Sequence, residues 1–240
     1  MAQLPPPEHV AIIMDGNNRW ARQRFLPRAM GHKAGIDAIR PVAEACDRLG
    51  IRVLTVYAFS TENWNRPPDE VAALMELFSE TIRREVDDCI RRGVEMRFCG
   101  RLGELPPALQ DQMRLATART RPNARAVLNV AVNYGGRQEI VDAIREMAQE
   151  GIDLSRLDET MVARHLYTHG LPDPDLIIRT AGEMRLSNFL LWQAAYAEFY
   201  STPTLWPDFG ESELIDAVAA YHRRTRRFGS RPEEIPHRGR

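Results

Sequence analysis

The sequence contains little cysteine and no long apolar run. Cys46, Cys89 and Cys99 are isolated and lack the CxxC spacing of zinc or redox sites, so we expect reduced cysteines in the core. No apolar stretch approaches the roughly 18 residues of a membrane span, and the proline-rich first residues lack the apolar core of a signal peptide. We therefore expect a cytoplasmic protein, at most peripheral to the inner face of a membrane.

Lysine is nearly absent: Lys33 is the only one, and arginine carries almost all of the positive charge. Arginine suits bidentate phosphate recognition, although a GC-rich genome would produce the same bias, and we attribute most of the arginines to that cause. The net charge of −1 argues against general nucleic-acid binding. The sequence also has neither a GxGxxG motif nor a P-loop, which argues against a nucleotide-binding module.

Short apolar runs alternate with helical patterns along the chain, without an internal repeat. The alternation predicts a single α/β domain with a mainly parallel sheet flanked by helices, and 240 residues are enough for a full core. We expect this domain to span residues 1–240, with flexible tails at 1–8 and 230–240. The predicted strands are 10–14, 51–59, 94–99, 126–132 and 175–180, and the predicted helices are 31–50, 69–93, 106–120 and 136–151.

The stretch HVAIIMDGNNRWAR, residues 9–22, joins a buried strand to a helix through a tight turn. Backbone N–H groups at such a corner can bind phosphate. A carboxylate such as Asp15 repels phosphate unless a divalent cation lies between them, and Mg²⁺ is commonly held by carboxylates together with phosphate oxygens. The residues indicate a metal–diphosphate site, although the same turn also begins ordinary helices. The candidate residues here are Asp15, Gly16, Asn17, Asn18, Arg19 and Trp20.

A second polar stretch, STENWNRPPD at 60–69, follows the predicted strand at 51–59. Loops beyond the carboxyl ends of strands build the sites of α/β proteins. The alternative is a solvated loop closed by Pro67 and Pro68. The candidate residues of this loop are Ser60, Thr61, Glu62, Asn63, Trp64 and Arg66.

A third stretch, RTAGEMRLSNFLLWQAAYAE at 179–198, begins at the end of the last predicted strand. Arg179, Arg185 and Ser187 can chelate a diphosphate through charge-assisted hydrogen bonds. Two arginines near a strand end can equally pair with surface carboxylates, so these residues alone leave both interpretations open.

Together, the three stretches resemble the signatures of the cis-prenyltransferases, the family of undecaprenyl and polyprenyl diphosphate synthases. The resemblance covers roughly residues 9–229 in ordered motifs, including WPDF at 206–209 and RFG at 227–229. Asn18 stands where the commoner signature has a second glycine, and Ala181 where Ser or Gly is usual. Neither departure threatens the chemistry. The DDxxD motif of the trans-prenyltransferases is absent.

The resemblance implies a six-stranded sheet with a hydrophobic tunnel. It implies an enzyme that condenses isopentenyl diphosphate repeatedly with an allylic diphosphate, such as farnesyl diphosphate, and makes each new double bond cis. The implied product is undecaprenyl diphosphate, the precursor of the lipid carrier for cell-wall peptidoglycan synthesis. A homodimer is also implied, with Arg227 and Gly229 reaching the partner's site. The alternative is a non-catalytic partner subunit of the same fold, which should have lost Asp15 and the two arginines.

The resemblance also implies roles for the candidate residues. Asp15 and Glu198 would bring Mg²⁺ to the phosphates, Asn63 would help to remove a proton through water or diphosphate, and Glu62 and Trp64 would organise the loop over the site. Isopentenyl diphosphate would be held by Arg179, Arg185, Leu186 and Ser187. The allylic diphosphate would be held by Gly16, Asn17, Asn18, Arg19, Trp20, Arg28 and His32, with Ser60, Thr61 and Arg66 nearby.

The helix at 69–93, which we expect Asp69 to cap, carries an apolar stripe. A stripe of this kind is normally core, but in the resembled family the corresponding helix lines the tunnel. Ala58, near the end of the strand at 51–59, raises the same question. Sequence alone does not separate a filled core from a tunnel wall. The stripe consists of Val71, Leu74, Met75, Phe78, Ile82, Val86 and Ile90.

Overall fold

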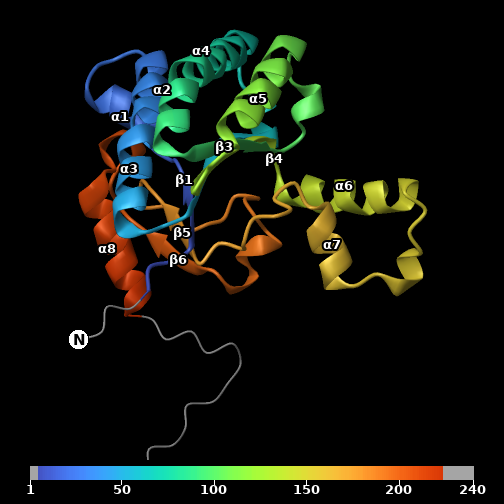
Figure 1. Ribbon diagram of the computed structural model, residues 1–240. Coiled ribbons are helices and arrows are strands. Elements are labelled where there is room, and N and C mark those ends of the chain that lie inside the picture. The colour runs from blue at the N-terminus through green and yellow to red at the C-terminus, as the bar shows by residue number, and fades with distance from the viewer. Residues whose placement is uncertain (1–4, 224–240) are drawn as a thin grey trace, which may run out of the picture.

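A single six-stranded parallel sheet forms the centre of the protein, as the computed structural model shows for residues 5–223 (Figure 1). Its strand order is β3-β4-β2-β1-β5-β6. The sheet confirms the predicted α/β fold, and β6 is a strand that the sequence pattern did not reveal. The strands are β1 (His9–Ile13), β2 (Val53–Ser60), β3 (Val94–Cys99), β4 (Ala126–Tyr134), β5 (Leu176–Arg179) and β6 (Glu198–Ser201).

The position of β1 in this order creates a crevice at one edge of the sheet. β1 pairs with β2 on one side and with β5 on the other. Strands β2, β3 and β4 extend the sheet on the first side, and β5 and β6 extend it on the second, so the strand order reverses at β1. Ligands of parallel α/β sheets bind where the order reverses, outside the carboxyl ends of the strands. Asp15 follows β1 there, and Arg179 ends β5 beside it.

Helices connect the strands of the sheet. They are α1 (Asn17–Gln23), α2 (Arg28–Asp37), α3 (Ile39–Leu49), α4 (Pro68–Arg92), α5 (Pro107–Thr120), α6 (Gly136–Gln149), α7 (Glu159–His165) and α8 (Glu211–His222). None of the helices within residues 5–223 combines the length and the hydropathy needed to cross a membrane.

Two predicted helix boundaries were wrong. The predicted helix at 31–50 is in fact α2 and α3, which meet at Ala38. The break follows from Pro41, which has no N–H to donate to the carbonyl four residues earlier and is tolerated only in the first turn of α3. The long helix α4 begins at Pro68, so Asp69 lies in its first turn and is not the N-cap.

The helical layer lies mainly on one face of the sheet. Val10 and Ile12 of β1 point to this face, where α3 and α8 pack, and α4 and α5 cover the β3–β4 end. On the opposite face, Ala11 and Ile13 pack against Phe189 and Leu190, which belong to the segment between β5 and β6. Helices α6 and α7 pack on each other and extend to the right in Figure 1. The predicted tails lie largely outside the described residues.

A buried histidine joins β1 to β2 at the end of the sheet opposite the crevice. His9 is 1% exposed; its Nδ1 donates to the carbonyl oxygen of Pro172 at 2.7 Å, and its Nε2 accepts from the Thr55 hydroxyl at 2.7 Å. The carbonyl oxygen can only accept, so Nδ1 carries a proton, and in the neutral imidazole Nε2 is then the acceptor. Burial lowers the pKa of His9 from 6.5 to about 4, against the opposing effects of the Pro172 hydrogen bond and the Asp175 charge.

We expect His9 to make the fold sensitive to acid. Because the pKa of His9 is lower in the folded than in the unfolded protein, the unfolded chain takes up a proton first as the pH falls. The free energy of unfolding should therefore be greatest above pH 6.5 and decrease as the pH falls towards 4. The loss should reach about 3 kcal/mol. Urea unfolding of the wild type and of His9→Asn at about pH 7 and about pH 4.5 measures it. Equal losses of unfolding free energy in the two proteins would contradict this assignment.

Candidate active site

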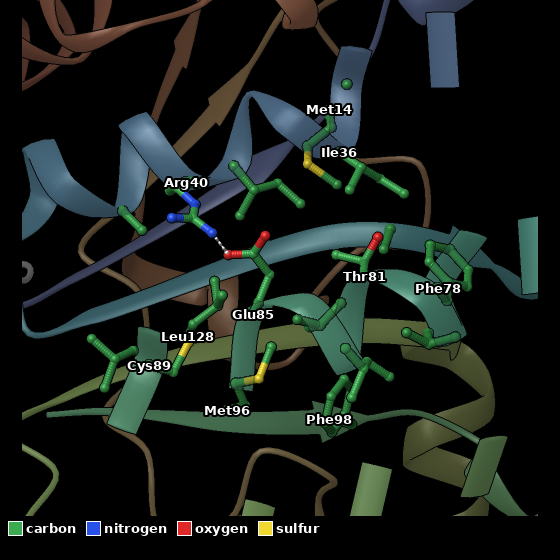
Figure 2. A pocket seen from close by; sticks show the side chains of 18 of the residues that line it. Met14, Ile36, Arg40, Phe78, Thr81, Glu85, Cys89, Met96, Phe98 and Leu128 are labelled. Atoms are coloured by element: carbon green, nitrogen blue, oxygen red, sulfur yellow. Dashed lines mark hydrogen bonds and ion pairs between the residues drawn. The ribbon is translucent and has the colours of Figure 1, made fainter. Parts of the chain in front are cut away.

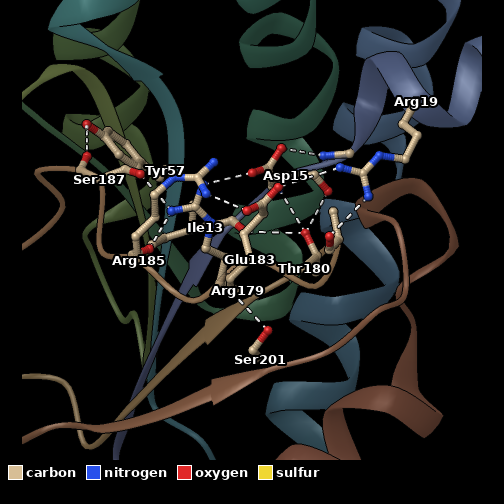
Figure 3. A network of polar contacts seen from close by, with 12 residues as sticks. Ile13, Asp15, Arg19, Tyr57, Arg179, Thr180, Glu183, Arg185, Ser187 and Ser201 are labelled. Atoms are coloured by element: carbon tan, nitrogen blue, oxygen red, sulfur yellow. Dashed lines mark hydrogen bonds and ion pairs between the residues drawn. The ribbon is translucent and has the colours of Figure 1, made fainter.

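The polar residues predicted at the strand ends meet at the crevice between β1 and β5 (Figure 3). A buried guanidinium lies at its centre: Arg179, at the end of β5, is 3% exposed. Its Nη2 donates to Asp15 Oδ2 at 2.8 Å, and its Nη1 donates to Ser187 Oγ at 2.6 Å and to the carbonyl oxygen of Arg185. One arginine thus ties the turn after β1 to the turn after β5.

Thr180 and Gly16 fix the Asp15 turn. The Thr180 hydroxyl accepts from the Asp15 N–H at 2.8 Å and donates to the Asp15 carbonyl oxygen at 2.7 Å. Asp15 Oδ1 accepts from the N–H of Gly16, whose φ of 104° favours glycine. The Asp15 side chain remains 36% exposed, so its carboxylate faces both the buried Arg179 and the open crevice.

A second carboxylate, Glu183, lies between two arginines of the predicted diphosphate sites. It forms an ion pair with Arg185 and lies 3.6 Å from Arg19 Nη2. Arg19 also donates to the carbonyl oxygen of Ala181 at 3.1 Å, and Ser201 of β6 donates to the carbonyl oxygen of Glu183 at 3.0 Å. Figure 3 shows Arg19 and Arg185 on opposite sides of this carboxylate. Arg19 and Arg185 therefore approach the crevice from its two sides.

A polar pocket of about 660 Å³ opens beside Asp15. We call its basic wall, formed by Arg19, Arg28, His32 and Arg66, the basic cradle. Gly16, Asn17 and Asn18 also line it, together with the apolar Phe25 and Leu26. The backbone and side chain of Asn17 pack directly on α2, where a Cβ at Gly31 would lie 2.3 Å from the Asn17 carbonyl oxygen.

Glu70, in the first turn of α4, holds three members of the basic cradle. It accepts from Arg28 at 2.5 Å and from Arg66 at 3.2 Å, and it lies 3.4 Å from His32 Nε2. Burial raises its pKa, but the Arg28 hydrogen bond and the charges of Arg66 and Arg28 together hold the pKa below its usual value. Glu70 therefore remains an anion that gathers the cations in the absence of a ligand.

Unpartnered polar atoms point to a ligand at this edge of the sheet. Within residues 5–223, four buried side-chain polar atoms have no hydrogen-bond partner, and three of them belong to the site: Asn17 Oδ1, Arg179 Nε and His32 Nε2, whose 3.4 Å contact with Glu70 does not form a hydrogen bond. An unpaired buried polar group is costly, so such atoms often indicate a missing ligand or water. These three lie where the sequence predicts diphosphate.

The loop after β2 forms a 3₁₀ turn whose side chains mainly organise neighbouring segments. Asn63 Oδ1 accepts from the Ser60 N–H at 3.1 Å and closes the turn. Trp64 Nε1 donates to Asn133 at 2.7 Å, and Glu62 accepts from Asn188 at 3.0 Å. Thr61 donates to Glu62 at 3.2 Å. The loop is thus built into the end of the sheet, unlike a freely solvated connection.

An apolar cavity of about 130 Å³ adjoins the polar pocket (Figure 2). Met14, Asn17 and His32 line both spaces, and we call these three residues the throat. Beyond the throat the wall consists of residues from β2, β3, β4, α2, α3 and α4, together with Met113 of α5 and Trp206. Ala58, Leu74, Phe78 and Ile82 are among them, so this part of the α4 stripe lines a cavity. Ile90, the last residue of the predicted stripe, is 42% exposed and does not line the cavity.

Several predicted site residues lie elsewhere. Trp20 packs outside the cradle, where its Nε1 donates to Asp208 at 2.7 Å. Leu186 packs against the core on the second face of the sheet. Glu198 begins β6 opposite Leu176, whereas Asp15 follows the opposite end of β1. Glu198 is therefore level with Val10 in the sheet, five residues before Asp15, and this separation corresponds to roughly 16 Å along a strand. One chain cannot bring both carboxylates to one ion.

Arg227 and Gly229 lie outside the described residues.

Four further residues contribute to the site although the sequence analysis did not name them as candidates, and each had a local signal. Thr180 follows a strand end, and Asn188 follows the serine of the third stretch. Glu70 and Glu183 are acidic residues close to arginines in the sequence. Asn188 adopts a positive φ of 63° and accepts from the Arg137 N–H at the start of α6.

Comparisons with known proteins agree with this geometry. The sequence pattern of the family described as "Putative undecaprenyl diphosphate synthase" matches residues 13–229. An isoprenyl transferase of Streptococcus agalactiae is 53% identical over 232 residues, covering 93% of each chain. One of Heliobacterium mobile is 52% identical over 227 residues, covering 93% of this chain and 87% of that protein.

Two solved structures share the fold. Lavandulyl diphosphate synthase from Lavandula x intermedia, in complex with dimethylallyl diphosphate, superposes with a TM-score of 0.90 at 40% identity, covering 95% of this chain and all of that one. A probable undecaprenyl diphosphate synthase from Campylobacter jejuni gives 0.78 at 30% identity, with the same coverage. The chain belongs to the undecaprenyl diphosphate synthase family of prenyltransferases.

We expect His32 to take up a proton when an anion binds. Burial lowers its pKa, and the Arg66 charge lowers it further, so the imidazole is largely neutral near pH 7 without ligand. A bound diphosphate would favour the charged form. Calorimetric titration with inorganic diphosphate, in buffers of different ionisation enthalpy, measures the protons taken up. The uptake should fall in His32→Asn and not in the control His169→Asn; an unchanged uptake in His32→Asn would contradict the role.

Proposed function

We propose that the chain condenses isopentenyl diphosphate repeatedly onto an allylic diphosphate, with farnesyl diphosphate as the starter. The observation that carries this proposal is the throat: Met14, Asn17 and His32 border both the basic cradle and the apolar cavity. An allylic diphosphate has the same two parts, an anionic head and a hydrocarbon tail. Lavandulyl diphosphate synthase, which shares the fold, was solved with such a ligand, dimethylallyl diphosphate.

The basic cradle would hold the allylic head. Arg19, Arg28, Arg66 and protonated His32 would neutralise its charge, and the residues at 16–18 would contact it from the turn. When the C1–O bond breaks, negative charge develops on the leaving diphosphate, and donors already in place stabilise that charge. Glu70 would release part of its hold on these cations as the diphosphate replaces it.

Arg179, Arg185 and Ser187 would hold isopentenyl diphosphate on the other side of Asp15. The double bond of this substrate attacks C1 of the allylic chain, a new C–C bond forms, and diphosphate leaves. A proton is then lost to restore a double bond. Asn63 would assist its removal through water or the diphosphate, since an amide is itself a poor base.

Mg²⁺ fits Asp15 as a single protein ligand. Within residues 5–223 no group of three or more His, Cys, Asp or Glu side chains is arranged to hold a metal ion, which agrees with an ion completed by substrate phosphates. A bound Mg²⁺ would supply positive charge to the diphosphates. Asp15 would then exchange part of its contact with Arg179 for the ion. Glu198 could contribute to such an ion only in the site of a partner chain.

Undecaprenyl diphosphate is the proposed product, which would serve cell-wall peptidoglycan synthesis. We further propose a cytoplasmic homodimer that releases its lipid product at a membrane surface. The alternative, a non-catalytic partner subunit, finds no support at the crevice, where Asp15, Arg179 and Arg185 are all present.

Mass spectrometry of the reaction products tests the proposal. The protein is incubated with farnesyl diphosphate, labelled isopentenyl diphosphate and Mg²⁺. We expect a ladder of polyprenyl diphosphates that ends at a defined length. An absence of label in any product longer than farnesyl diphosphate would contradict the proposed activity, and a ladder that ends elsewhere than at undecaprenyl diphosphate would change the product alone.

The two diphosphate sites should respond separately to mutation. Arg179→Ala and Arg185→Ala should each raise the KM for isopentenyl diphosphate about ten- to a hundredfold, because each removes a charge-assisted hydrogen bond. The KM for the allylic substrate should change much less. Arg48→Ala, which removes an ion pair with Glu211 away from the site, is the control. Equal effects on the two KM values would mean that the sites are assigned wrongly.

Ala58→Leu should shorten the products. Ala58 lines the apolar cavity, so added bulk would obstruct a growing chain while the first condensation remains fast. Chromatography of labelled products measures the length distribution. If the change instead acts only by overpacking, which costs about 1–3 kcal/mol, total yield falls and the distribution is unchanged.

A further inference from the structure

The end of the apolar cavity farthest from the throat is charged. Its lining there includes five residues that we call the distal ion-pair cluster: Arg40 and Glu44 on α3, and Glu85, Asp88 and Arg92 on α4. Helix α4 begins beside the basic cradle, and its cavity-lining residues run from Leu74 to Arg92, with Asp88 and Arg92 in the part of the helix farthest from the cradle. The 18-residue separation between Leu74 and Arg92 corresponds to roughly 27 Å along the helix.

The cluster joins two helices across the cavity. Arg40 Nη2 lies 2.6 Å from Glu85 and its Nη1 lies 3.5 Å from Asp88. Arg92 lies 2.7 Å from Asp88 and 2.7 Å from Glu44. Figure 2 shows the Arg40–Glu85 pair beside apolar cavity residues such as Leu128 and Met96. The pairs therefore close the space between α3 and α4 at this end.

Burial distinguishes these ion pairs from ordinary surface pairs. The Glu85 and Asp88 side chains are only 14% and 15% exposed, whereas both arginines are 43% exposed. On the same helix, Asp87 pairs with Arg119 at 2.7 Å, but these side chains are 69% and 49% exposed and do not line the cavity. The distal cluster thus places half-buried charge at the end of an apolar space.

Hydrocarbon that advances along the cavity gains free energy from burial as long as the walls are apolar. To advance beyond the cluster, it would have to separate ion pairs whose carboxylates are largely removed from water. A partly buried charge that loses its partner is strongly destabilising. The favourable burial of each added unit therefore ends at the cluster.

We propose that the distal ion-pair cluster ends the space for the hydrocarbon chain and thereby limits the length of the product. The inference rests on the proposed function, since it assigns a length limit to the same elongation reaction. It makes the five residues of the cluster determinants of product length, although none of them lines the polar pocket beside Asp15.

Replacing an ion pair by apolar side chains of similar length tests the inference. Arg40→Met/Glu85→Met removes the Arg40–Glu85 pair together with the Arg40–Asp88 and Arg84–Glu85 contacts, and leaves Asp88 with Arg92. Glu44→Met/Arg92→Met removes the Arg92–Glu44 and Arg92–Asp88 pairs and leaves Asp88 with Arg40, so that one variant remains if the other does not fold. The control is Asp87→Met/Arg119→Met, which removes a pair of similar distance from the same helix. Labelled products are separated by chromatography and identified by mass spectrometry, and the first condensation is timed separately.

We expect the main product of either cavity variant to be longer than that of the wild type by at least one isoprenoid unit. The rate of the first condensation should stay within about twofold, and the control should give the wild-type distribution. Unchanged or shorter products from the cavity variants, or an equal lengthening in the control, would overturn the inference. A wild-type protein that incorporates no label would instead overturn the proposed function, and the inference with it.

Discussion

The contact between Asp15 and Arg179 organises the site. Arg179 is nearly inaccessible to solvent, so its guanidinium must find partners inside the protein, and it finds them in Asp15, Ser187 and the Arg185 backbone. Because β1 and β5 are neighbours at the point where the strand order reverses, one side chain can hold both turns. The position of both diphosphate sites proposed here follows from that contact.

The site must also accommodate two chemically opposite parts of the proposed substrate. A diphosphate requires cations and hydrogen-bond donors, whereas a growing hydrocarbon requires a dry surface. The chain separates them by a single layer of residues, the throat, with the basic cradle on one side and the α4 stripe on the other. Carboxylates complete the arrangement at both ends: Glu70 gathers the empty cradle, and the distal ion-pair cluster closes the cavity.

The sequence predicted five of the strands and most of the site because both depend on local patterns. Short apolar runs marked the buried strands, and polar residues directly after them marked the edge where a parallel sheet binds ligands. The strand β6 was missed because Glu198–Ser201 is a short, partly exposed edge strand without a clear apolar run. The break between α2 and α3 has a local signal in Pro41, which the apolar periodicity of residues 31–50 does not reflect.

Other features depend on distance in space, which no local pattern gives. Glu70 looks like an ordinary acid in the first turn of a helix, and its role arises only when α2 packs beside α4. The α4 stripe has the same periodicity whether it fills a core or lines a cavity. Glu198 lies in a signature-like stretch, yet the register of β6 places it at the edge of the sheet away from Asp15.

A crystal structure with a non-hydrolysable allylic diphosphate analogue tests the central claim, the continuity of head and tail sites, most directly. We expect the diphosphate within hydrogen-bond distance of Arg28 and His32, and the hydrocarbon passing Met14 towards Ala58. A tail that points into solvent, or a head bound only by Arg179 and Arg185, would contradict it.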